Sequence, residues 1–352
     1  MANEPNWLSS ENVEGIESLL RSRGLLAEGQ HVESAGMAGE GNMNVTLRVR
    51  VSGGKSLVVK QSRRFVAKYD FIPAPLERAI YEARFYQFAR QHDSIASRMP
   101  QLIDWVADQY VLILEDLGEA SDATTVYQSD PTTRDRILGE ILPPLAQWLC
   151  SLHSAPKSHS WDASQFSNSK LRRLNHEHIF ILPFREQPAI DLDAVTPGLT
   201  EVSHSFRTDE SLTATIQSLG QRYLADGDPK RGDCLLHGDF YPGSWLKTHS
   251  GPMVIDPEFC FAGPAEFDWS VLVAHMRLCG ACDAIESVRQ LLPPTIQLNW
   301  SLVNAFAGVE VLRRLLGVAQ LPLVSDLNEK ERLIAAAADD VRAFNTSTSE
   351  TA

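Results

Sequence analysis

The period of the apolar residues changes near residue 119, and this change constrains the fold more than any other feature of the chain. Before it, residues 45 to 51 alternate between apolar and polar, which is the period of two expected of a strand. A turn at Ser52-Gly53-Gly54-Lys55 and the stretch SLVVKQ then complete a hairpin. After residue 119 the apolar residues recur mainly at helical spacing. The sequence therefore predicts an α+β protein with a small β-rich part followed by a larger, mainly helical part.

The other expected elements divide between these two parts. A second hairpin is expected over DWVADQYVLILEDLG, and a long helix over 132–154 should be interrupted at Pro143-Pro144. Further helices are expected over 10–24, 75–91, 209–225, 265–279, 299–319 and 328–345, whereas residues 157–200 give no clear pattern. We expect an N-terminal lobe over 1–116, a C-terminal lobe over 117–345 and a disordered tail over 346–352. A cleft between two such lobes is a common place for a ligand.

The net charge restricts the kinds of partner. It is −13, which argues against a general nucleic-acid or anionic-membrane binder, because phosphate binding needs a surplus of Lys and Arg. No apolar stretch approaches the ~20 residues that a membrane span needs. The polar, acidic start of the chain also lacks the pattern of a signal peptide. We therefore expect a cytoplasmic protein without a nucleic-acid or membrane partner, although a small basic pocket for a nucleotide is not excluded.

The cysteines are few and odd in number. Five Cys residues do not suggest a disulfide framework. Cys279-Gly-Ala-Cys282 has the spacing of a redox motif or of half a zinc site, but no second pair accompanies it. A reduced, structural role is therefore favoured over a chemical one.

Three features of the first part suit a nucleotide. The stretch GEGNMN at 39–44 contains Gly39 and Gly41, which would let backbone N–H groups approach phosphate oxygens, although a hairpin turn needs glycines as well. Lys60 on the return strand could place its charge on the α- and β-phosphates, and Glu82 in the helix over 75–91 could hold that Lys. The alternatives are a solvated strand-edge Lys and a surface Glu.

The connector between the two parts offers a third contact with a nucleotide. In LILEDLG, backbone groups of Glu115 and Leu117 could hydrogen-bond the edge of a purine. Backbone recognition leaves no mark on the side chains, so the sequence alone does not test this expectation.

Two acidic stretches follow in the helical part. In LHGDFYPGS, Asp239 comes just after the expected buried strand at 234–236, where it could orient or deprotonate a substrate hydroxyl. In VIDPEF, Asp256 and Glu258 would point the same way if the segment is extended, and two carboxylates suit Mg²⁺. The loop over 244–253 has a hairpin's length and would bring Asp239 and Asp256 to the same end of a strand pair. Each Asp alone could be a turn residue, but together these parts match phosphoryl-transfer machinery.

The motifs carry a family resemblance. HGDFYPGS followed by VIDPEFCFAGPAEFD resembles the catalytic and metal segments of aminoglycoside phosphotransferase-like kinases, and within these the chain is most similar to the methylthioribose kinase family. GEGNMN matches that family's G-[DE]-G-N-x-N, DPEF at 256–259 matches its metal motif, and GVEVLRRLLGVA matches its helix with an Arg pair. The resemblance covers about residues 36–320. It implies a bilobal protein-kinase-like fold, ATP with Mg²⁺, and phosphorylation of a small molecule's hydroxyl group.

The resemblance also implies a role for each matched residue. Asp239 would be the catalytic carboxylate, and Tyr241, Arg313 and Arg314 would lie by the substrate. The metal ligands would be Asp256, Glu258 and Ser244. The nucleotide would be bound by Gly39, Gly41, Asn42, Asn44, Lys60 and Glu82, with Glu115 and Leu117 at the base. For the Arg pair, the alternative is a solvated helix face, because neighbouring residues of a helix point about 100° apart.

The chain departs from the family at positions that plausibly touch the acceptor. Tyr241 stands where the family usually has His, and no Trp precedes the helix of Glu82. The expected acceptor is 5-methylthioribose or a related 5-deoxy sugar. The alternatives are another small alcohol, an amino alcohol or an aminoglycoside, and, in a different class, a nucleotide-binding pseudokinase. The family resemblance also implies a possible homodimer.

Overall fold

Two compact units make up the chain. The computed structural model describes residues 5–39, 43–66, 69–158, 161–228, 230 and 232–349. The first unit comprises Met1–Ala120 together with Met253–Phe259, and the second comprises Ser121–Pro252 and Cys260–Ala352. The sequence had placed the segment of Asp256 in the C-terminal lobe, whereas it packs with the first unit, because its side chains bind residues of the N-terminal strands and helix.

The first unit is built on an antiparallel five-stranded sheet with the strand order β1-β2-β3-β7-β6. The strands are β1 (Val32–Met37), β2 (Asn44–Val51), β3 (Lys55–Ser62), β6 (Leu102–Val106) and β7 (Val111–Glu115). Alternate residues of β2 and β3 are buried with Ile16 and Leu20 of helix α1 (Val13–Ser22), so the predicted period of two does mark the core face. The unit also contains β4 (Phe65–Val66), β5 (Tyr69–Pro73), α2 (Arg78–Ala89) and α3 (Asp93–Ala96).

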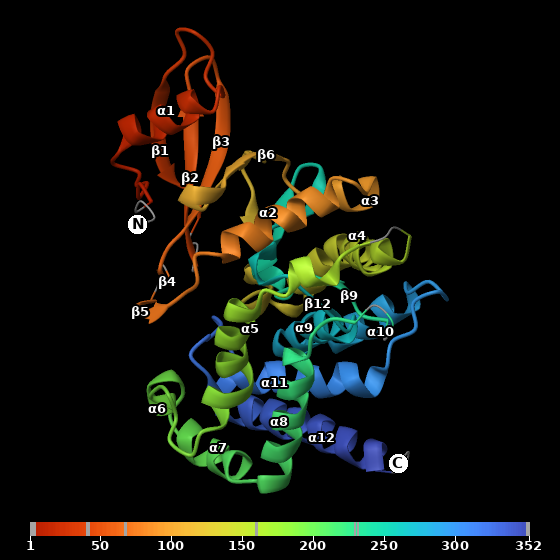
Figure 1. Cartoon of the computed structure of the whole chain (residues 1–352). Coiled ribbons are helices and arrows are strands. Elements are labelled where there is room, and N and C mark those ends of the chain that lie inside the picture. The colour runs from red at the N-terminus through yellow and green to blue at the C-terminus, as the bar shows by residue number, and fades with distance from the viewer. Residues whose placement is uncertain are drawn as a thin grey trace. The chain divides into compact units, whose positions relative to one another are not determined.

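The second unit is mainly helical. Its helices are α4 (Pro131–Ser158), α5 (Ser169–His176), α6 (Leu192–Val195), α7 (Leu199–Arg207), α8 (Glu210–Leu224), α9 (Glu266–Leu278), α10 (Cys282–Gln290), α11 (Trp300–Leu316) and α12 (Leu327–Ser349). Helix α11 packs against α9 and α12 (Figure 1) and is buried on every side from Ala305 to Leu316. It is therefore the central helix of this unit.

Short strands frame the segments that carry the site residues. β9 (Cys234–Leu236) pairs with β12 (Phe261–Gly263), and β8 (Ser121–Asp122) pairs with β10 (Trp245–Thr248). The chain passes from the second unit to the first within β11 (Gly251–Val254). In the sequence, β9 precedes Asp239 and β12 follows Glu258.

The predicted α+β class is confirmed, and the differences are local. The helices expected in both parts are present, but the predicted interruption at Pro143-Pro144 is wrong, because α4 runs unbroken from Pro131 to Ser158. Residues 157–200 contain short helices and a π-helical turn at Glu177–Ile181. Helix α12 extends to Ser349, into the tail that the sequence predicts to be disordered. Within the residues described, no helix combines the length and apolar character needed to cross a membrane.

Candidate active site

Lys60 is the centre of a buried ionic cluster in the first unit. Its Nζ lies 2.8 Å from Oε1 of Glu82 and 2.6 Å from Oδ1 of Asp256. Lys60 and Glu82 are both buried, which excludes the alternatives of a solvated strand edge and a surface Glu. The predicted Lys–Glu pair is therefore present, and it includes the Asp of the second acidic stretch.

The three charges of this cluster differ in their access to water. Burial alone would lower the pKa of Lys60, but the carboxylates of Asp256, Glu82 and Glu258 raise it well above its usual range, so the amine is charged. Burial raises the pKa of Glu82 despite the adjacent Lys. The Asp256 side chain keeps 49% of its surface exposed, against 1% for Glu82. Asp256 is thus the carboxylate of this cluster that remains open to an incoming ligand.

The backbone at Asp256 has an unusual conformation. Its φ is +59°, in the left-handed region that residues other than glycine seldom adopt, although Asp tolerates it better than most. Residues so held are often found at functional sites, where the surrounding structure stabilises them. Here the ion pair with Lys60 and the turn at Pro257–Phe259 fix the residue from both sides.

Glu258 has partners different from those of Asp256. Its Oε2 lies 3.1 Å from Nε of Arg78 and accepts a hydrogen bond of 2.9 Å from Nδ2 of Asn44. The expectation of an extended segment is wrong, because Pro257–Phe259 forms a 3₁₀ turn, and the carboxylates of Asp256 and Glu258 therefore bind different cations. Glu258 is buried, and with Arg78 it ties this turn to α2 and to the start of β2.

The Gly-rich stretch is only partly described. Gly39 has a φ of +139°, which favours glycine, while Gly41 and Asn42 lie outside the described residues. Asn44 is buried, and its Oδ1 accepts a hydrogen bond of 3.0 Å from Nε of Arg78. The buried side chain of Asn44 therefore holds the first residue of β2 in place.

The connector after β7 carries the two residues expected at a purine. Glu115 is the last residue of β7, and its backbone N–H donates to the carbonyl oxygen of Gln101 at 2.9 Å. Leu117 lies in the irregular stretch that follows.

In the second unit, Asp268 of α9 holds the backbone just before Asp239. Its carboxylate accepts hydrogen bonds from the backbone N–H groups of His237 (2.8 Å) and Gly238 (2.9 Å), and Nε2 of His153 lies 3.0 Å from it. Asp268 is fully buried. The sequence did not indicate Asp268, yet this residue fixes the backbone that positions Asp239.

Asp239 lies beside two cations. Its Oδ1 is 3.6 Å from a terminal nitrogen of Arg314 and 3.9 Å from one of Arg313. Burial raises the pKa of Asp239, although both guanidinium groups act in the opposite direction. The side chain still keeps 23% of its surface exposed. A carboxylate in this state is accessible, and its pKa is closer to neutrality than that of an ordinary Asp, as suits a general base.

A single carboxylate holds both arginines. Oε2 of Glu310 lies 2.6 Å from Nε of Arg313, and its Oε1 lies 2.8 Å from Nε of Arg314. Glu310 reaches both because it precedes them by three and four residues on α11. All three side chains are buried, so the alternative of a solvated helix face is excluded. Burial would raise the pKa of Glu310, but the two arginines hold it well below its usual range.

Tyr241 and Ser244 lie in the same loop as Asp239. The guanidinium carbon of Arg314 stands 4.9 Å from the ring centre of Tyr241, and the ring of His275 lies 5.2 Å away from that of Tyr241. The hydroxyl of Ser244 donates to the backbone oxygen of Asp239 at 2.9 Å. Tyr241 is therefore close to the Arg pair, as expected, while Ser244 stabilises the loop.

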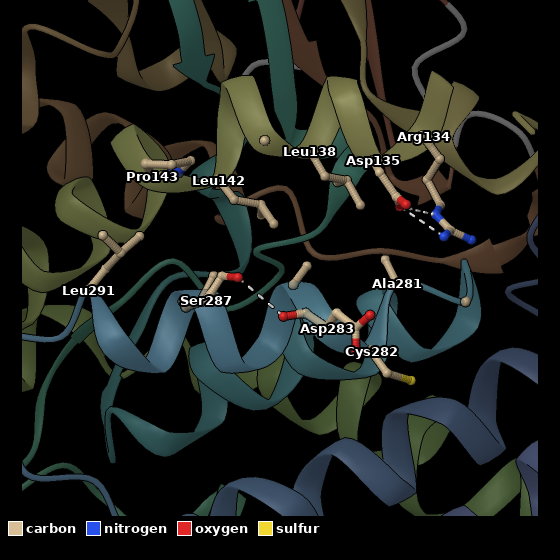
Figure 2. Close-up of a pocket in the computed structure, with 14 residues that line it drawn as sticks. Arg134, Asp135, Leu138, Leu142, Pro143, Ala281, Cys282, Asp283, Ser287 and Leu291 are labelled. Atoms are coloured by element: carbon tan, nitrogen blue, oxygen red, sulfur yellow. Dashed lines mark hydrogen bonds and ion pairs between the residues drawn. The ribbon is translucent and has the colours of Figure 1, made fainter. Parts of the chain in front are cut away.

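A separate cavity of about 370 Å³ lies between α4 and α10 (Figure 2) and contains none of the predicted site residues. Cys282 lines it, and Arg134 is turned toward Asp135 at its edge. Burial raises the pKa of Cys279 to about 11, which makes that thiol a poor nucleophile. Across the described ranges, no group of three or more His, Cys, Asp or Glu side chains is placed to hold a metal ion.

The sequence profile described as phosphotransferase enzyme family matches residues 40–289. Methylthioribose kinase of Pectobacterium atrosepticum is 27% identical over 271 residues, which cover 74% of this chain and 64% of that enzyme. Methylthioribose kinase of Exiguobacterium sibiricum is 24% identical over 348 residues, covering 88% of this chain and 85% of the relative. The chain thus spans less than two thirds of the Pectobacterium enzyme.

Solved structures support the fold. Choline kinase LicA from Streptococcus pneumoniae superposes with a TM-score of 0.54 at 14% identity, over 94% of this chain and 98% of that one. Spectinomycin phosphotransferase APH(9)-Ia, solved with ADP and spectinomycin, gives 0.53 at 13% identity, with the same coverage. The predicted kinase-like α+β fold is therefore confirmed.

Proposed function

Because the chain belongs to the phosphotransferase enzyme family, we propose that it is an ATP- and Mg²⁺-dependent kinase that phosphorylates a hydroxyl group of a small molecule. The observation that carries this proposal is the environment of Asp239. Its carboxylate is accessible, has a raised pKa and lies beside two buried arginines that one Glu holds in place. Asp239 would orient the acceptor hydroxyl and take its proton, and the arginines would stabilise the negative charge that develops on the transferred group.

Lys60 would bind the phosphates of the nucleotide. It is charged, buried and fixed by Glu82, which matches the positioning that a phosphate-binding Lys needs. Solved relatives of the same fold contain ADP or AMP, which is compatible with ATP here. Gly39, Gly41, Asn42 and Asn44 would surround the phosphates, and the backbone of Glu115 and Leu117 would bind the base.

Asp256 fits a magnesium ion best. Mg²⁺ is usually held by one or two carboxylates together with substrate phosphates, and Asp256 offers a half-exposed carboxylate. The ion would neutralise negative charge on the phosphates during transfer. Glu258 and Ser244 remain proposed ligands, although Glu258 already binds Asn44 and Arg78, and the hydroxyl of Ser244 already donates to the backbone oxygen of Asp239.

The proposed acceptor is 5-methylthioribose or a related 5-deoxy sugar, which the methylthioribose kinase relatives support. The charges of the Arg pair are balanced by Glu310 and Asp239, so this cluster does not by itself separate a neutral sugar from a cationic amino alcohol or aminoglycoside. The net charge of −13 favours the cationic class, but it acts over the whole surface rather than at the site. A homodimer acting in the cytoplasm is the accompanying proposal, and light scattering after size exclusion tests the dimer.

The test is ADP release from ATP and Mg²⁺ with a panel of sugars, amino alcohols and aminoglycosides. We expect turnover with a 5-deoxy sugar, and a loss of about 10²-fold or more with Asp239→Asn at unchanged ATP affinity. Asp283→Asn, which changes an exposed carboxylate of α10, serves as the matched control and should leave the rate unaltered. Stabilisation by ATP without ADP release for any acceptor would favour the pseudokinase instead.

A further inference from the structure

A buried hydrogen-bonded chain lies behind the arginine pair. Nδ1 of His275 is 2.5 Å from the hydroxyl of Tyr127, and its Nε2 is 3.3 Å from Oε1 of Glu310. Tyr127, His275 and Glu310 come from three different segments of the second unit, and all three are buried. Three polar side chains from separate segments seldom meet in a core without a role that specifies their contact.

The partners of His275 determine where its proton lies. Burial lowers the pKa of His275 to about 4, so the ring is neutral and carries one N–H. Glu310 is ionised and can only accept, so the proton must be on Nε2 and is donated to Glu310. Nδ1 is then an acceptor, and the hydroxyl of Tyr127 donates to it. One tautomer satisfies the whole chain.

This arrangement fixes the rotation of the Glu310 carboxylate. Oε1 accepts hydrogen bonds from His275 and Arg314, while Oε2 accepts one from Arg313. Each arginine binds Glu310 through Nε and presents a terminal nitrogen toward Asp239. A rotation of the carboxylate would therefore move both guanidinium groups relative to Asp239.

We propose that His275 is a positioning residue of the transfer reaction, which acts through Glu310 to set both arginines beside Asp239. The inference rests on the proposed function, because it assigns a role in phosphoryl transfer. The competing explanation is an ordinary core histidine, whose bonds to Tyr127 and Glu310 contribute only to stability.

Two variants at the same position separate these explanations. In His275→Gln the side-chain amide reaches the place of Nε2 and can still donate to Glu310, but the bond to Tyr127 is lost. In His275→Asn the shorter side chain reaches the place of Nδ1, so it keeps Tyr127 and loses Glu310. Each variant removes one buried hydrogen bond. His275→Asn loses the bond to an ionised carboxylate and should lose more stability, but a purely structural role predicts similar turnover for both.

The positioning role predicts different turnover. We expect kcat of His275→Gln within a few-fold of the wild type, and kcat of His275→Asn reduced about 10²-fold, the usual effect of misplaced catalytic groups. KM for ATP should be unchanged in both. Equal kcat values for the two variants would overturn the proposal.

A second measurement covers the case in which His275→Asn does not fold or the acceptor is wrong. Exchange of the Arg313 and Arg314 Nε protons with solvent, followed by ¹⁵N NMR, reports on the Glu310 contacts without any turnover. These protons should stay protected in His275→Gln and in Tyr127→Phe, and unprotected exchange in both variants would refute the positioning role. A wild type with protected protons but no ADP release would count against the proposed function alone.

Discussion

Replacing Lys60 with methionine should destabilise the protein mainly through Glu82 and only slightly through Asp256, the two carboxylates that Lys60 binds. The change removes the charge and keeps an unbranched chain of similar length. Glu82 is 1% exposed and would be left in the core without its cation, whereas Asp256, with 49% of its side chain exposed, would be solvated by water. The two ion pairs are nearly equal in length, so distance alone does not predict this difference.

The magnitudes follow from the exposure of each partner. Removing one member of a buried pair costs about 3–5 kcal/mol, because the remaining charge is uncompensated. A solvent-exposed pair contributes about 0–1 kcal/mol. In double-mutant cycles, Lys60→Met should therefore couple to Glu82→Gln by about 3 kcal/mol or more, and to Asp256→Asn by less than about 1 kcal/mol.

The pH dependence gives an independent check. Burial raises the pKa of Glu82, and removing Lys60 should raise it further. A carboxyl group with a raised pKa in the folded state contributes stability at low pH and loses it as pH rises, because the folded state binds the proton more tightly. The destabilisation by Lys60→Met should therefore be larger at pH 8 than at pH 5.5.

The assay should report on the first unit rather than on the whole chain. Hydrogen exchange of peptides from β3 and α2, followed by mass spectrometry at both pH values, gives the free energy of opening for this unit. Equal coupling energies for Glu82 and Asp256, or the same destabilisation at both pH values, would refute the reasoning from burial.

Four further results are expected. Asp268→Asn should lower the free energy of unfolding by about 2 kcal/mol, because it weakens charge-assisted hydrogen bonds to the loop before Asp239. Turnover should also slow, and an unchanged kcat would contradict this. Gly243→Ala would place a Cβ 2.3 Å from the ring of Tyr241, so KM for the acceptor should rise while KM for ATP stays constant in steady-state kinetics. Because the pKa of His275 is lowered to about 4, the wild type should lose about 3 kcal/mol more stability to urea than His275→Gln as pH falls from 6.5 to 4. Chelation with EDTA should abolish ADP release, and Mg²⁺ should restore it.

The sequence identifies residues whose position in a motif has a chemical reason. Lys60 stands on the return strand of a hairpin whose first strand alternates clearly, and Glu82 lies in a helix that the sequence also predicts. Arg313 and Arg314 follow from the resemblance alone, since nothing in their helical spacing shows that Glu310 can bind both. The sequence alone was enough to predict these residues, because each belongs to a motif that the family shares.

The site residues that the sequence did not indicate, Asp268 and His275, are buried in the core of the second unit. Asp268 and His275 lie on a helix that is mainly apolar between them, so neither stands in a pattern that indicates a site. Their partners are backbone groups or side chains far apart in sequence, such as Tyr127. Only the tertiary structure shows that these buried groups meet, and no periodicity in the chain would have indicated it.

Local reasoning failed where backbone conformation depends on neighbours. Pro143-Pro144 would end an isolated helix, yet the packing of α4 in the second unit keeps it continuous. Asp256 and Glu258 would share a face of a strand, yet the left-handed residue and the turn that follows separate them. In both places tertiary contacts outweigh the local preference.

The division of the chain has a consequence for biosynthesis. Met253–Phe259 belongs to the first unit, although the residues on either side of it belong to the second. While the protein is being translated, the amino-terminal unit therefore lacks one of its own segments until much of the following unit has left the ribosome. During that interval Arg78 lacks Glu258, and Lys60 has Glu82 but not Asp256 as a partner. The amino-terminal unit can thus reach its final stability only after residue 259 has emerged, and a fragment truncated at residue 120 would remain permanently in that unfinished state.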